Sequence, residues 1–510
     1  MAEFTQARPL TIAVDLTHLL SGGTNGGVKP FIFEYLKWLG SQRHVPVRLL
    51  FLTRGESHAE VRSLARFGDE LICLVGGSGG GDVRTPVHSP SERSWLDAPG
   101  DLTARLGADI LYCPFGQCTW SFPGIPTLAT IVDVLHRDYP FSLSPDVAAH
   151  RENVFQETMR TADTIQGISE FTLSRVAHHY GFPRDRMFCS PIAIHERLRP
   201  RVELPGQDRI GRPYFFYPAN AWRHKNHEVL FLAYGIYRSQ AGDGAWDLVL
   251  TGHDDQAMRE LLSLASTLGL GANVRFLGHL TDDRFGAVWS EASALVFPSL
   301  HEGFGIPLVE AMAFGLPVLS SRAGALPEVG GDACLYADTT KPLELAEALS
   351  RIASDGPLRA RLRERGYDRL KSFSFERDAR RFLDELLACA RRPARRTTKG
   401  YYTDGWTAPK AYFGTPNTSQ RERLELALRP MQAERSLKVY HGSDLIGQVR
   451  VPPATSPILR FPVFPRGRPV TLIVPDATRL SDADHRTHGV QIASLSLRDG
   501  AGIETDLLVP

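Results

Sequence analysis

The chain is poor in cysteine, carries no excess of either charge and has no long apolar run. Its six cysteines among 510 residues form no C-x-x-C pair, which argues against a zinc site or disulfide framework and indicates a reducing environment. Lys and Arg number 58 against 57 Asp and Glu, so no global field favours nucleic acid as a partner. No stretch reaches the roughly 18 apolar residues of a membrane span, and residues 1–9 lack a signal-peptide core. We therefore expect a cytoplasmic globular protein.

The length exceeds what one hydrophobic core supports, and the pattern of apolar runs changes along the chain. From residue 10 to about 190, and again from 214 to about 371, short apolar runs alternate with helical periodicities, which predicts two parallel sheets. After about residue 410 the runs become short, alternating and separated by Pro and Gly, which predicts a β-sandwich. We expect an N-terminal Rossmann-like domain (1–195), a second Rossmann-like domain (196–390), a basic linker (391–410) and an accessory β-domain (411–510).

The most informative segment follows the apolar run 294–298 and contains two glutamates eight positions apart. Glu302 lies in a glycine-rich turn, and Glu310 lies on the apolar helix that follows, whose first turn accommodates Pro307. This geometry binds phosphate, because glycines let backbone amides approach an anion and a helix N-terminus carries partial positive charge. Glu302 would then lie beside the phosphates, and Glu310, about two turns further on, would hydrogen-bond a group such as a ribose.

This segment closely resembles the E-x7-E signature of the retaining family-4 glycosyltransferases, which have the GT-B fold. The resemblance implies an α/β architecture of two doubly wound domains facing across a cleft, with the sugar nucleotide bound at the carboxyl ends of the strands. It implies that Glu302 is catalytic and contacts the transferred sugar, and that Glu310 contacts the ribose of the donor. The backbone of Gly303, Phe304 and Gly305 would lie near the sugar and the phosphate.

Three further loops of the second domain complete the expected donor site by the same resemblance. Lys225 matches the lysine with which the family grips the donor diphosphate, a task that suits a compact charge. The family usually has Arg about five residues earlier, where this chain has Asn220, so either Arg223 or a neutral hydrogen bond from Asn220 completes the clamp. Gly252 and Asp282 follow later strands and are expected near the phosphate and the base.

Two segments of the first domain are expected to face the same cleft. The glycine loop that ends with Gly26 and Gly27 resembles the family loop that lies against the donor phosphate and the acceptor. A later block resembles one in which many family members have Thr-Ile-His-Asp, whose histidine contacts the transferred sugar. This chain has Val132 at the histidine position, so Asp133 and His136 remain as the polar candidates for a catalytic role.

The first hypothesis is a retaining, metal-independent hexosyltransferase that moves a hexose from a nucleotide sugar to a glycan or lipid-linked saccharide in bacterial surface polysaccharide synthesis. The turn at 222–227 resembles bacterial mannosyltransferases, which favours GDP-mannose as the donor, and no further cofactor is expected. The second hypothesis is a catalytically silent module that binds a sugar nucleotide or a glycan, and a sugar-nucleotide epimerase is a third. The basic run 391–396 leaves peripheral association with the inner membrane open.

Overall fold

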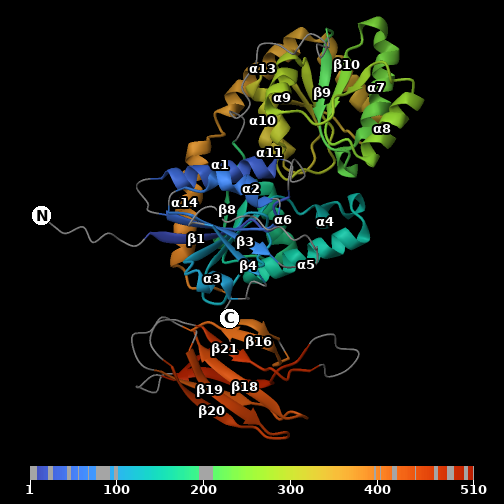
Figure 1. Cartoon of the computed structure of the whole chain (residues 1–510). Helices are drawn as coiled ribbons and strands as arrows, with labels where there is room; N and C mark the ends of the chain where they lie inside the picture. Colours follow the sequence, from blue (N-terminus) through green and yellow to red (C-terminus); the bar gives the residue numbers. More distant parts are fainter. Residues whose placement is uncertain are drawn as a thin grey trace, which may run out of the picture.

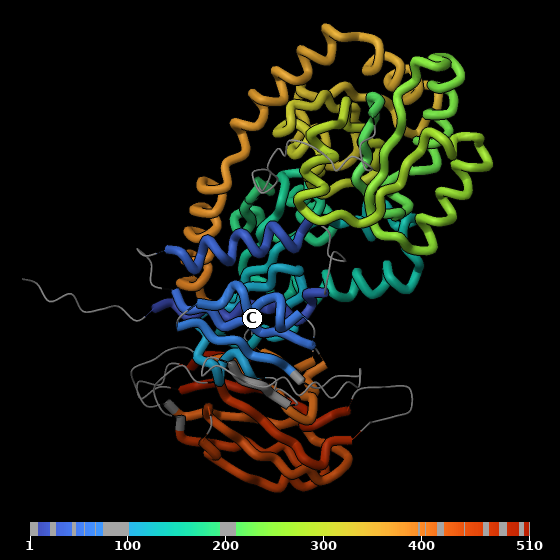
Figure 2. Tube along the Cα trace, turned by 45° about the horizontal axis from the view of Figure 1, so that its top comes forward, coloured from blue at the N-terminus to red at the C-terminus, as the bar shows by residue number. Residues whose placement is uncertain are grey.

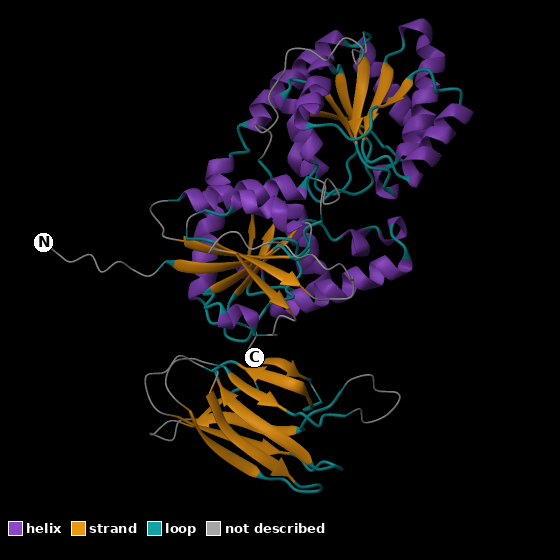
Figure 3. Cartoon of the chain, in the orientation of Figure 1, coloured by secondary structure: helices purple, strands orange, loops and turns teal. Residues whose placement is uncertain are grey.

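Two parallel sheets and one purely β unit follow one another along the chain (Figure 1). The computed structural model describes residues 9–20, 27–42, 47–55, 57–66, 68–75, 92–96, 101–193, 211–395, 398–402, 404–415, 422–442, 444–463, 469–478, 487–498 and 504–508. In Figure 3, helices cover both parallel sheets, whereas the C-terminal unit consists of strands and loops. The predicted α/β class with a C-terminal all-β unit is confirmed.

The first sheet has eight parallel strands in the order β4-β3-β2-β1-β5-β6-β7-β8. Its strands are β1 (Leu10–Asp15), β2 (Val47–Thr53), β3 (Glu70–Val75), β4 (Glu92–Leu96), β5 (Ile110–Cys113), β6 (Thr127–Ile131), β7 (Thr164–Gly167) and β8 (Met187–Cys189). The helices are α1 (Val28–Ser41), α2 (Ser57–Val61), α3 (Leu102–Arg105), α4 (Leu135–Asp138), α5 (Pro145–Thr161) and α6 (Glu170–Tyr180). Residues 11–15 of β1 are all buried, as expected for a parallel sheet covered on both faces.

The second sheet has six parallel strands in the order β11-β10-β9-β12-β13-β14. Its strands are β9 (Tyr214–Pro218), β10 (Asp247–Thr251), β11 (Val274–Phe276), β12 (Ala294–Phe297), β13 (Val318–Ser320) and β14 (Cys334–Tyr336). Its helices are α7 (His227–Ala241), α8 (Gln256–Thr267), α9 (Asp282–Glu291), α10 (Ile306–Ala313), α11 (Leu326–Gly330), α12 (Pro342–Ser354) and α13 (Gly356–Leu370). The strand order reverses between β9 and β12, and such a switch point is where open α/β sheets bind ligands.

The last helix of the α/β part, α14 (Phe375–Arg391), crosses back from the second domain to the first (Figure 1). Tyr35 of α1 packs edge-on against Phe375 and Phe382, with ring centroids 5.4 and 5.3 Å apart. Phe382 also lies 5.0 Å from Tyr112 of β5. The second domain was expected to end at residue 390, and α14 ends at Arg391.

The C-terminal unit contains two antiparallel sheets, ordered β15-β16-β21-β18-β19 and β20-β17-β22-β23. Its strands are β15 (Thr398–Tyr401), β16 (Thr407–Phe413), β17 (Glu422–Leu428), β18 (Arg435–His441), β19 (Asp444–Val451), β20 (Ile458–Val463), β21 (Val470–Ile473), β22 (Ile492–Arg498) and β23 (Glu504–Asp506). Both sheets contribute to one apolar core, including Leu437 and Val439 from one and Leu424 and Leu495 from the other. The shared core makes the unit a β-sandwich.

The segment expected to be a solvated linker is instead ordered against the first domain. Strand β15 begins at Thr398, inside the range 391–410, and pairs with β16. The backbone amide of Arg395 donates to the carboxylate of Asp163, and its guanidinium lies 4.9 Å from the ring of Phe182. Strand β15 has only four residues, too few to show an alternating pattern, so the sequence pattern placed the start of the sandwich too late. Figure 2 shows the sandwich beside the first domain.

Candidate site for donor binding and transfer

The loops after β9 and β12, on either side of the switch point, bring together two of the expected site residues. Lys225 Nζ donates to Glu302 Oε1 at 2.6 Å, and the two side chains are only 13% and 12% exposed. The ammonium group of Lys225 also lies 5.6 Å from the ring of Phe297, at the end of β12. A partly buried ion pair at this place is poorly screened by solvent, so its charges are available to a bound ligand at close range.

Glycines shape the turn that carries Glu302, because the backbone of the first domain comes too close for side chains. A Cβ at position 303 would overlap the carbonyl oxygen of Val132, which follows β6. Gly305 has φ of 97°, a left-handed conformation that favours glycine, and it leads directly into α10. The ring of Phe304 is buried and meets Phe373 edge-on at 5.8 Å, so Phe304 anchors the turn and leaves only its backbone for the predicted donor contact.

Glu310 lies on α10, as predicted, and its side chain is only 3% exposed. This burial excludes the alternative in which Glu310 is an ordinary solvated charge on the outer face of an amphipathic helix. A carboxylate is rarely buried without a polar role, because removing it from water is costly. The ribose contact remains a prediction, and the position of Glu310 two helical turns after Glu302 is compatible with it.

Asn220, which stands where the family usually has an arginine, has a structural partner in the next loop. Asn220 Oδ1 accepts a hydrogen bond from the backbone amide of His253 at 3.0 Å, which ties the loop after β9 to the loop after β10. A Cβ on Gly252 would lie 2.8 Å from the carbonyl oxygen of Ala219, so the two loops touch through their backbones. An arginine at 220 has no acceptor atom and could not make this contact. Arg223 is exposed on the following turn.

Two other predicted donor-site positions lie at the ends of helices. Asp282 is the first residue of α9 and is exposed. Gly27 is the residue before α1, and a Cβ there would overlap the side chain of Ile306 at the start of α10. The N-terminal ends of α1 and α10 therefore meet, and the contact of the glycine loop with the donor phosphate and the acceptor stays a prediction. Gly26 lies outside the described residues.

Asp133 of the first domain lies next to the Glu302 turn. Its carboxylate accepts from the backbone amide of Leu135 at 2.9 Å and forms an ion pair with Arg151. Burial by itself would raise the pKa of Asp133, but Arg151 and the Leu135 amide outweigh it and hold the pKa below its usual value. A Cβ on Gly303 would lie 3.2 Å from Asp133 Cβ, which places this carboxylate beside the turn. An ionised, already paired Asp133 suits orientation or charge stabilisation better than proton abstraction.

His136 lies differently from the expected orientation toward the cleft. Its ring is 5% exposed, bonds through Nε2 to Tyr180 Oη at 2.8 Å and packs 4.4 Å from the ring of Phe155. Burial, then the charge of Arg151, lower the pKa of His136 to about 4. The first turn of α4 directs this side chain into the first domain, so we assign His136 a packing role.

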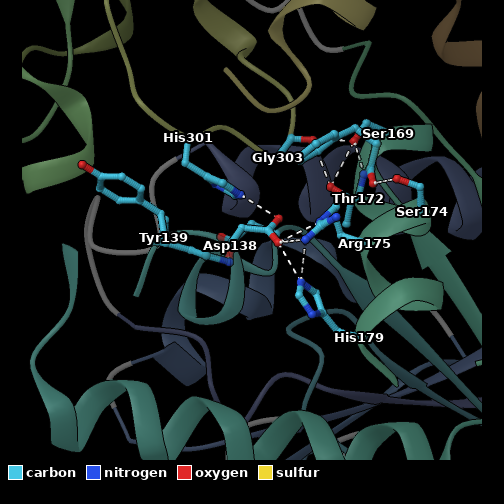
Figure 4. A network of polar contacts seen from close by, with 12 residues as sticks. Asp138, Tyr139, Ser169, Thr172, Ser174, Arg175, His179, His301 and Gly303 are labelled. Carbon is cyan, nitrogen blue, oxygen red and sulfur yellow. Dashed lines mark hydrogen bonds and ion pairs between the residues drawn. The ribbon is translucent and has the colours of Figure 1, made fainter. Parts of the chain in front are cut away.

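Asp138, two positions later, is the residue of this block that reaches the second domain, and sequence reasoning missed it. Its carboxylate bonds to Nε2 of His301 at 3.2 Å, to Nε2 of His179 at 2.8 Å and to Nε of Arg175 at 2.7 Å (Figure 4). Burial would raise the pKa of Asp138, but these three partners more than offset it and hold the pKa well below its usual range. The partners come from distant segments, so no local sequence pattern marks the group.

The described ranges contain neither a metal-binding cluster nor a membrane-spanning helix. No group of three His, Cys, Asp or Glu side chains there is placed to hold a metal ion. No helix in the described part of the chain is both long and apolar enough to cross a membrane. All six cysteines are buried, and none of them forms a disulfide.

Comparisons with known proteins agree with this architecture. Residues 205–369 match the family model for glycosyl transferases group 1. O-antigen chain mannosyltransferase B of Escherichia coli is 28% identical over 240 residues, which cover 45% of this chain and 62% of that protein. A D-inositol 3-phosphate glycosyltransferase of Nocardioides is 37% identical over 303 residues, covering 56% of this chain and 64% of that protein. This chain thus spans just under two thirds of the length of either relative.

A glycosyltransferase from Rickettsia africae has a similar structure, with a TM-score of 0.55 at 14% identity, covering 76% of this chain and all of the other. This likeness shows the fold, and the two sheets adopt the GT-B arrangement. The second sheet lies within the segment that matches the family model for glycosyl transferases group 1.

Proposed function

We propose that this protein is a retaining hexosyltransferase that uses a nucleotide sugar and no metal ion. The observation that carries the proposal is the partly buried pair of Lys225 and Glu302 beside the N-terminus of α10, at the switch point of the second sheet. A cation and a helix N-terminus at this point can bind a diphosphate, and a carboxylate beside them can hold hydroxyl groups of the sugar.

In the proposed reaction, the bond between the sugar C1 and the diphosphate oxygen breaks as a bond forms between C1 and the acceptor hydroxyl oxygen. The acceptor proton passes to the departing phosphate on the same face of the sugar. Lys225 exchanges Glu302 for the diphosphate and, with the α10 terminus, stabilises the negative charge that develops there. Glu302 orients the sugar and supports positive charge at C1. Such a mechanism depends on positioning and fixed charges rather than on a strong protein base.

A mannosyl donor is the first choice. The resemblance of the turn at 222–227 to bacterial mannosyltransferases motivates it, and the name of the Escherichia coli relative supports it. Thermal unfolding with GDP-mannose, UDP-glucose and UDP-N-acetylglucosamine in parallel tests this choice. A ligand at about 100 times its dissociation constant stabilises the folded state by roughly 2.7 kcal/mol, which is readily measured. A rise in melting temperature with a uridine nucleotide sugar alone would indicate that another hexose, and not mannose, is the donor sugar.

Basic side chains near the carboxyl edge of the first sheet favour an acceptor that carries an anionic group. A cavity of about 220 Å³ there is lined by Val132, His150 and Arg151 among others. Burial, then the charges of Arg54 and His150, lower the pKa of His18 to about 4, so His18 itself is neutral and the positive charge near it comes from its neighbours. The Nocardioides relative is named for a phosphorylated inositol. Product formation with mannose 6-phosphate but not with mannose would support an anionic acceptor, and equal rates would reject it.

The silent binding module is the second candidate, favoured by Val132 and Asn220 at positions where the family has other residues. Incubation with a sugar nucleotide in the absence of acceptor separates the candidates. Slow release of nucleoside diphosphate indicates transferase hydrolysis, an epimeric sugar nucleotide indicates an epimerase, and saturable binding without turnover indicates the silent module. A synthetic pathway for surface polysaccharide and peripheral attachment to the inner membrane remain proposals that fit the transferase.

A further inference from the structure

The residues on either side of Glu302 bond to the first domain, whereas Glu302 itself bonds within the second. His301 meets the carboxylate of Asp138 at 3.2 Å, and the carbonyl oxygen of Gly303 accepts from Ser169 Oγ at 2.7 Å and Thr172 Oγ1 at 3.2 Å (Figure 4). The carbonyl oxygen of Glu302, in contrast, accepts from the amide of Ala325. The first domain therefore holds the turn through hydrogen bonds to His301 and Gly303, the two residues next to Glu302.

All of these hydrogen bonds depend on one helix of the first domain, α6. Ser169 caps α6, accepting from the amide of Thr172 at 3.0 Å, and both hydroxyl side chains are buried. Arg175 and His179, one turn apart on α6, hold the Asp138 carboxylate that meets His301. The same helix thus supports the contacts on both sides of Glu302.

A carboxylate of the second domain fixes the start of this helix. Glu328, on α11, accepts from the backbone amides of Glu170 and Phe171, both at 2.8 Å. Backbone amides in the first turn of a helix have no partner within the helix, and the helix end favours negative charge. The loop before α11 is in turn built around Glu302, because a Cβ on Gly324 would overlap the Glu302 carbonyl oxygen. Helix α6 therefore contacts the Glu302 turn and the element packed behind it.

We propose that Asp138, Ser169 and Thr172 are positioning residues for Glu302, which set the carboxylate relative to the first domain by holding its two neighbours. The proposal rests on glycosyl transfer at Glu302 as put forward above. The acceptor side lies in the first domain and the donor side in the second, so the reacting atoms align only when the two domains hold one relative position. A misplacement of about 1 Å can lower a rate on the order of a hundredfold.

The Thr172 hydroxyl provides the sharpest test, because valine replaces it with little change of shape. With GDP-mannose as donor, we expect Thr172→Val to lower kcat by about three- to tenfold, with KM for the donor within about twofold of wild type. Thr172→Ser keeps the hydroxyl and should restore kcat. An unchanged kcat in Thr172→Val, or equal loss in the serine variant, would overturn the proposal.

A double-mutant cycle tests the other side of the turn. Asp138→Asn and His301→Gln should each lower kcat by about tenfold, and the double variant should be no slower than the slower single variant. Additive losses would show that Asp138 acts only within the first domain through Arg175 and His179. Glu376→Ala is the control, because it removes the acceptor of the hydrogen bond from Trp38 Nε1, a contact between α1 and α14 that does not involve residues 301–303, and kcat should be unchanged.

Amide hydrogen exchange separates failure of this inference from failure of the proposed function. Without any substrate, residues 301–305 should exchange faster in Thr172→Val than in wild type or Thr172→Ser. If wild type turns over no sugar nucleotide but this difference is found, the transferase assignment fails and the contact across the domains stands. If exchange is the same in all three proteins, the positioning role is overturned whatever the activity.

Discussion

The first domain has two junctions, and they are built differently. Toward the second domain, α14 packs through the rings of Phe375 and Phe382, but at the strand ends the contacts are hydrogen bonds to backbone groups and to single side chains, as in those of Ser169 and Thr172 with Gly303. Toward the β-sandwich, the ring of Phe122 meets Tyr412 edge-on at 4.9 Å, and both residues are buried. Lys399 Nζ donates to the Ser121 carbonyl oxygen beside this ring pair.

The difference indicates at which junction the domains can move relative to each other. A hydrogen bond exchanged for water costs little net free energy, about 0.5–1.5 kcal/mol, so a polar junction can open and close. Separating buried aromatic rings exposes apolar surface, at about 25 cal/mol for each Å², which favours a permanent contact. We therefore expect changes at the strand-end junction to affect turnover and changes at the sandwich junction to affect stability.

The largest effect should follow from Glu302→Ala. Loss of the carboxylate should lower turnover at least a hundredfold, about 2.7 kcal/mol in the transition state, while the melting temperature and nucleotide affinity stay close to wild type. Steady-state kinetics with the donor found by thermal shift, together with calorimetry for the nucleoside diphosphate, measure both. A variant that keeps more than about a tenth of wild-type turnover would refute the catalytic assignment.

The second prediction is that low pH destabilises the α/β part of the protein more than the sandwich. Burial lowers the pKa of His227 to about 3 and that of His136 to about 4, so these histidines must stay neutral in the folded state. Because the unfolded chain binds protons first, the free energy of unfolding falls as the pH drops from about 6.5 towards 4, by about 3 kcal/mol for a histidine whose pKa is lowered from 6.5 to about 4. Hydrogen exchange at pH 7.5 and 5 should show the two parallel sheets losing protection before the sandwich.

His136→Gln provides the check on that result, since it removes one titrating group while keeping a polar side chain. Its stability should depend less steeply on pH between 6.5 and 4 than that of wild type. An equally steep dependence would mean that other groups cause the acid lability, and equal loss of protection in the sandwich would break the comparison between the regions.

Tyr412→Ala should loosen the sandwich junction. Loss of the buried ring from Phe122 should destabilise the protein by about 2–4 kcal/mol, and the rate of transfer per folded molecule should stay within twofold. Thermal unfolding and kinetics at a temperature where the variant is folded measure the two quantities. A large fall in kcat without a change in stability would show that the sandwich helps to build the site. Tyr440→Ala is the matched control, on a half-buried tyrosine of the same sheet in β18, which β21 separates from β16.

The smallest of these effects concerns Lys225→Ala. We expect a loss of about tenfold in affinity for GDP or UDP, which is about 1.4 kcal/mol, and little change for the nucleoside alone, because only a diphosphate gains from the ammonium group. Isothermal titration with both ligands measures the difference. Equal weakening for both would indicate a disturbed turn, as would a melting temperature well below that of wild type.

Sequence reasoning located best the site residues that lie in one continuous segment. The strand β12, the turn with Glu302 and the helix α10 with Glu310 follow each other directly, and each is marked by an apolar run, a glycine or a proline that acts on its own neighbours. Lys225 was found through a similar short turn after β9. Local chain chemistry determines such elements, so they can be read without knowing what packs on them.

The direction of a side chain was the weaker part of the prediction. His136 and Asp138 are both polar and only two positions apart on α4, a difference that turns them to different sides of the helix. Asn220 was considered only as part of a diphosphate clamp, and its contact with the His253 amide was not predicted. These outcomes depend on partners supplied by other strands and helices.

By itself, the sequence determined the two parallel sheets, the later β unit and the place of the Glu302 turn between a strand and a helix, because apolar period and turn chemistry are local properties. Only the tertiary structure decided that Asp138, Ser169 and Thr172 hold that turn from the other domain and that Arg395 docks on Asp163. Those contacts join segments more than 130 residues apart, as for Ser169 and Gly303, whose separation is 134. Nothing in either segment alone specifies its partner, since the packing of whole domains brings them together.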